Sequence, residues 1–237
     1  TKDYAGWDLS ELTNDRPFPA AADPNYPQLR FIFLYAVLLT LLLLLLIGWY
    51  SSRNQSHPLL NFRFLFFQAA IGLAYMTAEG LFMNIYQKEF ISPSLAFICT
   101  LTPLLASSAV GGKILDKIRK PWTIVALVTI SFTFHWLLMF PLADFLTLGP
   151  RSIVIITLIS MSGFLMGYFF PFGLTLAKEK GLGANVGYYF ACNCVAGAFA
   201  VVFSYFMSVQ LGFSAVFFIS IFLYMIAVIF FFKLTDS

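Results

Sequence analysis

Seven long apolar stretches, separated by short polar segments, dominate this sequence. A helix crosses the hydrocarbon core of a bilayer with about 20 predominantly apolar residues. Within lipid, such a helix satisfies all its backbone polar groups internally. These constraints predict an all-α integral membrane protein with about seven transmembrane helices. The predicted spans cover residues 31–50, 64–86, 94–115, 122–142, 152–174, 186–207 and 211–232.

The composition supports this class and excludes several others. The chain is 60% hydrophobic and only 11% charged, whereas a soluble domain carries about 25% charged residues. Lipid is therefore the expected partner for much of its surface. The net charge is only +3, and the basic residues lie in short loops, which argues against nucleic acid. The three cysteines lie in apolar segments without partners at ligand spacing, so no metal or cofactor is expected.

Two regions of different character divide the chain. Residues 1–30 are polar and rich in proline, without an apolar core, and we expect an extramembrane lead-in there. This stretch lacks the apolar core of a cleavable signal peptide. Residues 31–237 form the predicted transmembrane domain.

The distribution of Lys and Arg predicts the orientation in the membrane. Alternating the spans places Arg30, Lys88 and Arg151 on one side. The richer side, which the positive-inside rule assigns to the cytoplasm, holds Arg53, Arg63, Lys113, Lys117, Arg119, Lys120, Lys178, Lys180 and Lys233. The N-terminus is then predicted outside and the C-terminus in the cytoplasm.

Glu79 is the most informative single residue, since it lies well inside the second span. A charged side chain at membrane depth costs about 2.5–3.5 kcal/mol on insertion scales, so it faces the bundle interior by default. Two interpretations stand side by side. Glu79 is an ion, proton or polar-ligand site, with Tyr75 one turn away as a further candidate. Alternatively, it makes a structural hydrogen bond or lies near the interface.

Two further polar residues lie inside predicted spans. His135 in the fourth span is either a proton relay or a packed, hydrogen-bonded side chain. Asn193 in the sixth span lies among small residues spaced four apart, such as Gly197. That spacing lets helices approach closely, with Asn193 as a polar contact between them. A substrate site is the alternative for Asn193.

Helix-breaking residues thread the fifth span at Gly167, Pro171 and Gly173. Interrupted helices of this kind line cavities in transporters, although Gly and Pro are also commoner in membrane helices generally.

The loop after the third span has its own pattern. It combines Gly112 and Asp116 with the basic residues Lys117 and Arg119. It resembles the loop between the second and third helices of a major facilitator superfamily half, although Ile118 stands where that family usually has Gly. The resemblance implies that the last six helices form one such half and that this loop is cytoplasmic.

Four segments together resemble bacterial spermidine synthase-like integral membrane proteins. In chain order they are residues 12–18, 67–79, 167–174 and 187–193. They are similar to that family's "TDDRPFF", "GLGFMLVE", "GMPFPLGL" and "WGVNG" stretches, with Glu79 on its Glu and Asn193 on its Asn. Asn14 departs from the first Asp. The resemblance implies a bacterial cytoplasmic membrane protein whose soluble synthase-like domain ends within residues 1–30.

The resemblance does not bring an enzymatic activity with it. No Gly-rich strand-to-helix turn precedes an acidic ribose-binding residue, so no donor site is assigned and no catalytic residue is predicted. The predicted external N-terminus also conflicts with a synthase domain that needs a cytoplasmic donor.

Three functional hypotheses follow. The first is a transporter-like membrane half that moves a small solute or anchors a soluble partner, with Glu79 and Asn193 lining its interior. The second is a non-catalytic structural or accessory subunit of a larger membrane complex. The third, an enzyme acting within the bilayer, lacks paired catalytic groups. A polar cavity shared by Glu79 and Asn193 favours transport, whereas dense packing around both and a broad apolar face favour the structural role.

Overall fold

The computed structural model describes residues 27–53, 62–87, 90, 92–115, 117–118, 120–139 and 148–235. This part of the chain is all helical, and it contains seven segments long and apolar enough to cross a membrane. The predicted fold class is therefore confirmed. The helices are α1 (Pro27–Arg53), α2 (Phe62–Tyr86), α3 (Pro93–Leu115), α4 (Pro121–Met139), α6 (Leu148–Met166), α7 (Phe169–Glu179), η2 (Gly183–Asn185), α8 (Val186–Leu211) and α9 (Phe213–Thr235).

The fifth predicted span is interrupted. Residues 150–179 form one apolar segment, but the helix breaks between α6 and α7 at Gly167 and Tyr168. Pro171 has no N–H to donate to the carbonyl of Gly167, four residues earlier, and its ring crowds that carbonyl. At the break, the Tyr168 N–H donates to the carbonyl of Leu165, three residues earlier, at 3.3 Å. This turn is tighter than that of an α-helix, in which the acceptor lies four residues earlier.

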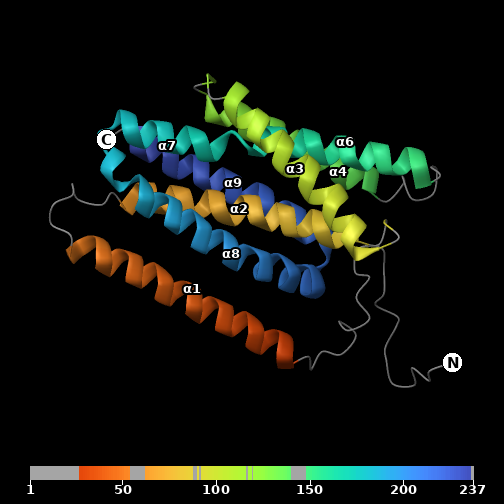
Figure 1. The fold of residues 1–237 in the computed structure, drawn as a ribbon, viewed down its shortest axis with the longest axis horizontal. Helices are drawn as coiled ribbons and strands as arrows, with labels where there is room; N and C mark the ends of the chain where they lie inside the picture. Colours follow the sequence, from red (N-terminus) through yellow and green to blue (C-terminus); the bar gives the residue numbers. More distant parts are fainter. Residues whose placement is uncertain are drawn as a thin grey trace.

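Helix α2 lies at the centre of one group of helices, with α8 packed on one side and α9 on the other (Figure 1). A second group pairs α3 with α6, and α4 joins the groups because it packs on both α6 and α9. The last two helices are linked by Gly212 alone, whose φ of +90° suits only glycine. This short link makes α8 and α9 a tight helical hairpin.

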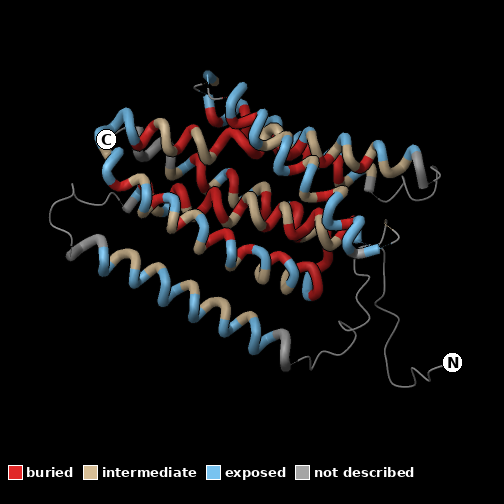
Figure 2. The backbone as a smooth tube through the Cα atoms, viewed as in Figure 1, coloured by how far each residue is buried: buried red, intermediate tan, exposed pale blue. Residues whose placement is uncertain are grey.

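The burial pattern separates α1 from the rest (Figure 2). None of the residues in the apolar window of α1 is buried, whereas most of those in the α2 window are. The main neighbour of α1 is α8. A helix that is apolar all round and unburied requires lipid, or another protein, as its surroundings.

Glycines bring the helix backbones of each pair into direct contact. On α3 and α6, Gly111 lies against the carbonyl of Phe164, and a Cβ at Gly163 would come within 2.5 Å of the carbonyl oxygen of Leu104. On α2 and α8, Gly72 lies against the carbonyl of Asn193. Small residues permit this approach, which is a main source of helix association in membranes.

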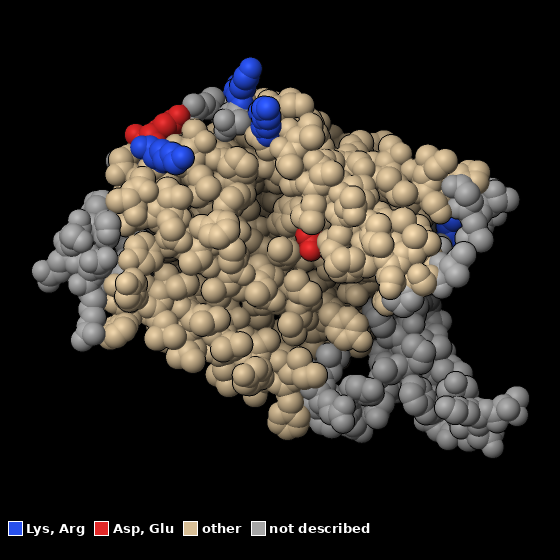
Figure 3. All heavy atoms as spheres, viewed as in Figure 1, with Lys and Arg blue, Asp and Glu red and all other residues tan. Residues whose placement is uncertain are grey.

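Most of the described Lys and Arg side chains gather at one end of the bundle, where α3 and α7 finish (Figure 3). That end holds Lys113, Lys117 and Lys120 around the α3–α4 connection, and Lys178 and Lys180 after α7. We refer to it as the basic end. Asp116 and Arg119, which the sequence motif includes, lie outside the described residues, as do residues 1–26 of the predicted lead-in.

Candidate functional site

A cavity of about 610 Å³ lies where α6 gives way to α7, between these helices and α2, α3 and α8. We call it the Tyr75 cavity. Its wall consists mainly of apolar side chains and of small residues such as glycine. The apolar side chains include Ile71, Met76, Leu105, Ala109, Met166 and Phe170. The polar side chains among the lining residues include Tyr75, Ser108 and Asn193.

Three of the predicted helix-packing and loop residues meet at this cavity. Gly112 at the end of α3 lies against the break, so that a Cβ there would come within 3.0 Å of the carbonyl oxygen of Gly167 and 3.1 Å of the Pro171 ring. All three residues line the cavity. The interrupted helix therefore forms part of its wall, as in the cavities of many transporters.

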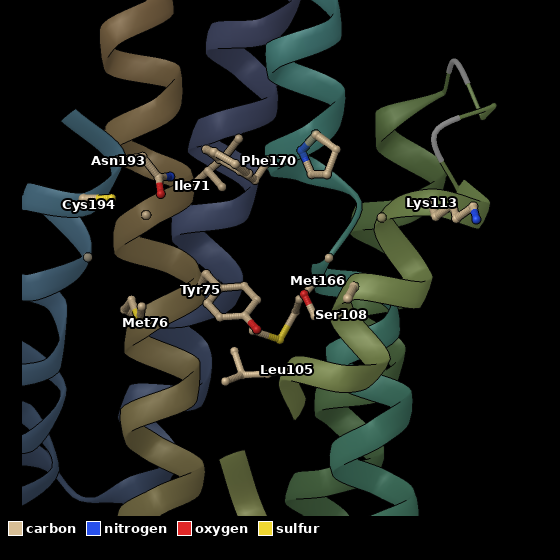
Figure 4. A pocket seen from close by; sticks show the side chains of 16 residues that line it. Ile71, Tyr75, Met76, Leu105, Ser108, Lys113, Met166, Phe170, Asn193 and Cys194 are labelled. Carbon is tan, nitrogen blue, oxygen red and sulfur yellow. The ribbon is translucent and has the colours of Figure 1, made fainter. Parts of the chain in front are cut away.

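Tyr75 projects from α2 into this space. Its hydroxyl points across the cavity toward Met166 and Ser108 (Figure 4). The oxygen is buried, and it makes no hydrogen bond with the described residues. An unsatisfied buried hydroxyl is costly, so a molecule that enters the cavity gains a hydrogen-bonding partner here.

Asn193 borders the same cavity but already has a partner. Its Nδ2 donates to the backbone carbonyl of Gln68 on α2 at 2.9 Å. One turn along α2 from this bond, Gly72 lies against the backbone of Asn193. This geometry matches the interpretation of Asn193 as a polar contact that fastens α8 to α2.

Glu79 lies outside the Tyr75 cavity. It lines a second hollow, of about 470 Å³, between α1, α2, α3 and α8. The two hollows follow one another along the same face of α2, with Gly72, Tyr75 and Met76 in the first and Glu79 and Gly80 in the second. The structure thus brings Tyr75 and Asn193 together and places Glu79 at a separate hollow, so Glu79 and Asn193 do not share one polar cavity.

His135 is held in a buried chain of hydroxyl groups that links α4 to α6. Its Nδ1 lies 3.2 Å from the Ser162 hydroxyl, which is 2.8 Å from that of Ser131. The imidazole stacks on Phe82 with ring centroids 4.6 Å apart. All of these side chains are fully buried, and His135 lines neither hollow. The geometry favours packing over proton relay for this residue.

Gly173 serves packing as well. A Cβ there would approach the ring of Phe67 to 2.5 Å and Nε2 of Gln68 to 2.6 Å. It fits α7 closely onto α2, and it does not border the Tyr75 cavity.

Tyr168 makes a hydrogen bond that was not predicted from the sequence. Its hydroxyl donates to the backbone carbonyl of Ile118 at 2.7 Å. This bond ties the helix break to the connection between α3 and α4, where Lys117 is exposed. Ser108, which lines the cavity, was not predicted either. It lies in a run of small residues before Gly112, and this run is the one signal of it in the sequence.

In the part of the chain that the structure describes, no group of three or more His, Cys, Asp or Glu residues is placed to hold a metal ion. A comparison with protein-family models finds no matching family, and comparisons with curated proteins and with solved structures find no match either.

Proposed function

We propose that this chain is the solute-binding membrane half of a transporter-like protein, and that its solute occupies the Tyr75 cavity. The observation that carries the proposal is the coincidence of three features at one place. A helix is interrupted at Gly167, the cavity opens beside the interruption, and the unpartnered Tyr75 hydroxyl points into it. Discontinuous membrane helices form the substrate sites of many transporters, and the volume is in the range of small-molecule sites.

The lining defines the class of solute. Apolar and small side chains dominate the wall, and Tyr75 and Ser108 offer hydroxyl groups. Lys113 also borders the cavity, but its side chain extends away from it (Figure 4). A charged solute would therefore lack a counter-charge inside, which is costly away from water. The expected solute is small, uncharged and mostly apolar, with one or two hydrogen-bonding groups.

The proposal also includes a family for the chain and its orientation in the membrane. We place the basic end in the cytoplasm by the positive-inside rule, with α2 to α9 as one half of the major facilitator type. The four segments that resemble spermidine synthase-like membrane proteins support an anchoring role for a soluble domain. The separate position of α1 beside α8 supports a six-helix unit that follows one preceding helix.

A second candidate function is that of a structural subunit in a larger membrane complex. The unburied α1 favours it, with exposed Leu34, Leu38 and Leu45. Asn193 and the glycine contacts also serve helix packing alone. This candidate predicts protein neighbours on α1 and nothing bound in the Tyr75 cavity.

Native mass spectrometry of the protein, purified in mild detergent from its own membranes, separates the two candidates. Leu105 lines the cavity and is half-exposed, so Leu105→Trp fills the cavity with little effect on packing. Leu127→Trp on α4 is the matched control, since Leu127 is 40% exposed and does not line the cavity.

The proposal predicts a small neutral molecule bound to the wild type and to Leu127→Trp, and absent from Leu105→Trp. A particle that contains only lipid and unrelated subunits, with identical spectra for all three proteins, would contradict it and favour the structural role.

A further inference from the structure

The hollow beside Glu79, which we call the Glu79 groove, has a chemistry unlike that of the Tyr75 cavity. Ile32 of α1, Met83 of α2, Leu101 of α3 and Val201 of α8 form apolar walls around the carboxylate. The two hollows share no lining residue. The groove lies nearer the end of the bundle opposite the basic end. Glu79 is seven residues before the end of α2 at Tyr86, a distance of about 10 Å along a helix.

Among the described residues that line the groove, none supplies a counter-ion to the carboxylate of Glu79. Its Oε2 is buried and has no hydrogen-bond partner among the described residues, and no Lys, Arg or His lines the groove. The described part of the chain has one other acidic residue, Glu179, which neighbours Lys178 and Lys180 in sequence. In Figure 3 one acidic side chain lies alone among uncharged residues, while another lies beside basic side chains. A positive charge in the groove would therefore stabilise the ionised form of the Glu79 carboxyl group.

The other polar and aromatic groups of the groove suit an organic ammonium. Asn84 lies nearly one and a half turns beyond Glu79 on α2, and its amide oxygen can accept a second hydrogen bond. Phe97 and Tyr205 present aromatic rings, whose faces attract cations. A hard metal ion fits poorly, because calcium requires six to eight oxygen ligands and the side chains that line the groove offer one carboxylate, one amide and one phenol.

The size and position of the groove indicate where its occupant comes from. Phe97 and Val201 are exposed on the outer surface of apolar helices, so the groove opens to lipid. The groove has a volume of about 470 Å³, which suits a small molecule. A partner helix is about 10 Å wide and would need a longer, flatter surface, so we do not expect a helix in the groove.

We propose that the Glu79 groove binds a lipophilic primary ammonium that enters from the bilayer. The ammonium group donates hydrogen bonds to the Glu79 carboxylate and to Asn84. Its apolar body lies between α1, α3 and α8, in contact with Phe97 and Leu101. This site is independent of the Tyr75 cavity, so either proposal can fail without the other.

The test uses the full chain in nanodiscs of phosphatidylcholine with two photoreactive probes. One is a diazirine-bearing dodecylamine, and the other is the matching dodecanol, which has the same tail without the charge. The amine is expected to label residues of α1, α3 and α8 that border the groove, and an excess of plain dodecylamine removes the label. Glu79→Gln is expected to weaken this labelling about tenfold, because a charge-assisted hydrogen bond is lost.

Two further variants make the result decisive. Glu179→Gln removes the other described acidic residue and should label like the wild type. Val201→Trp fills the groove from its exposed side and leaves the Glu79 side chain in place, so it should abolish the labelling even if Glu79→Gln fails to fold.

Three outcomes would overturn the proposal. The alcohol labels the groove as strongly as the amine, the amine label survives in Val201→Trp, or a co-purified protein helix occupies the groove and blocks the amine. The first outcome would make the groove an ordinary lipid contact.

Discussion

Polar side chains inside this bundle divide into those with a partner and those without. Asn193 and Ser204 donate to backbone carbonyls of α2, and His135 lies within hydrogen-bond distance of Ser162. These bonds join helices. Tyr75 and Glu79 instead have a buried oxygen without a partner, and each lines a hollow. At the residue scale, Tyr75 and Glu79 are distinguished by their access to a hollow, because other buried groups without a partner among the described residues, such as the Gln68 amide and the Tyr224 hydroxyl, line neither the Tyr75 cavity nor the Glu79 groove.

Tyr75→Phe separates binding from folding. The substitution removes an oxygen that has no hydrogen-bond partner and keeps the ring that packs against the core. We expect the free energy of unfolding to change by less than about 1 kcal/mol, while retention of the neutral solute falls. Thermal unfolding and native mass spectrometry of one purified sample measure both quantities. A large loss of stability with unchanged solute retention would contradict the assignment.

Asn193→Ala tests the opposite kind of residue. It removes the bond to the Gln68 carbonyl, so we expect a loss of stability of about 0.6 kcal/mol, the average for such bonds in membrane bundles, and of no more than about 1.7 kcal/mol. Ser204→Ala, which removes the bond to the Thr77 carbonyl on the same helix pair, is the matched comparison and should cost about as much. Unfolding in mixed micelles measures both, and a stabilising Asn193→Ala would show that the bond does not hold α8 to α2.

At the scale of helices, backbone contact through glycine fixes which helices pair. On α3 and α6, Gly111 and Gly167 each lie against a carbonyl of the facing helix. The contact also holds Gly112 against the helix break. The Tyr75 cavity therefore depends on a pair of helices that cannot separate without losing close packing.

Substitutions at these glycines should be costly. Gly111→Ala and Gly167→Ala place a methyl group against a facing carbonyl, so we expect each to lower stability by about 1–3 kcal/mol, as overpacking does. Gly187→Ala on α8 is the control, because a Cβ there meets nothing within 4 Å. Equal unfolding midpoints for the three variants would contradict the close contact between α3 and α6.

The helices were more predictable than their contacts. Span length follows from bilayer thickness, and the predicted 94–115 differs from α3 by one residue. The break at Gly167 was signalled by Pro171. The Tyr75 cavity was not predictable, because helices that are apolar on every side carry no periodic signal for their rotation. Whether a side chain of α2 lines the Tyr75 cavity or the Glu79 groove depends on how α3 crosses α2.

At the scale of the whole molecule, α1 stands apart from the six spans that run from α2 to α9. Its contacts are chiefly with α8, whereas α2, α8 and α9 are packed on one another. The unit from α2 to α9 contains the Tyr75 cavity entirely, but the Glu79 groove takes Ile32 from α1.

A chain that starts after residue 57 should therefore remain folded. We expect its unfolding temperature in detergent to lie within a few degrees of the full chain, because no residue in the apolar window of α1 is buried. The neutral solute should still bind, and the Glu79 groove should lose one wall. Aggregation of the shortened protein in several detergents would show instead that α1 is part of the folding unit.

Occupancy of the Tyr75 cavity by a small uncharged molecule is best tested by photolabelling of the full chain in nanodiscs. The probe is a neutral diazirine-bearing phenol, and labelled residues are identified by peptide sequencing. We expect labels on α2 around Tyr75 and on α3 around Leu105, retained in Leu127→Trp and absent from Leu105→Trp. Labels spread over the lipid-facing residues of α1 and α4, and unchanged by Leu105→Trp, would contradict it.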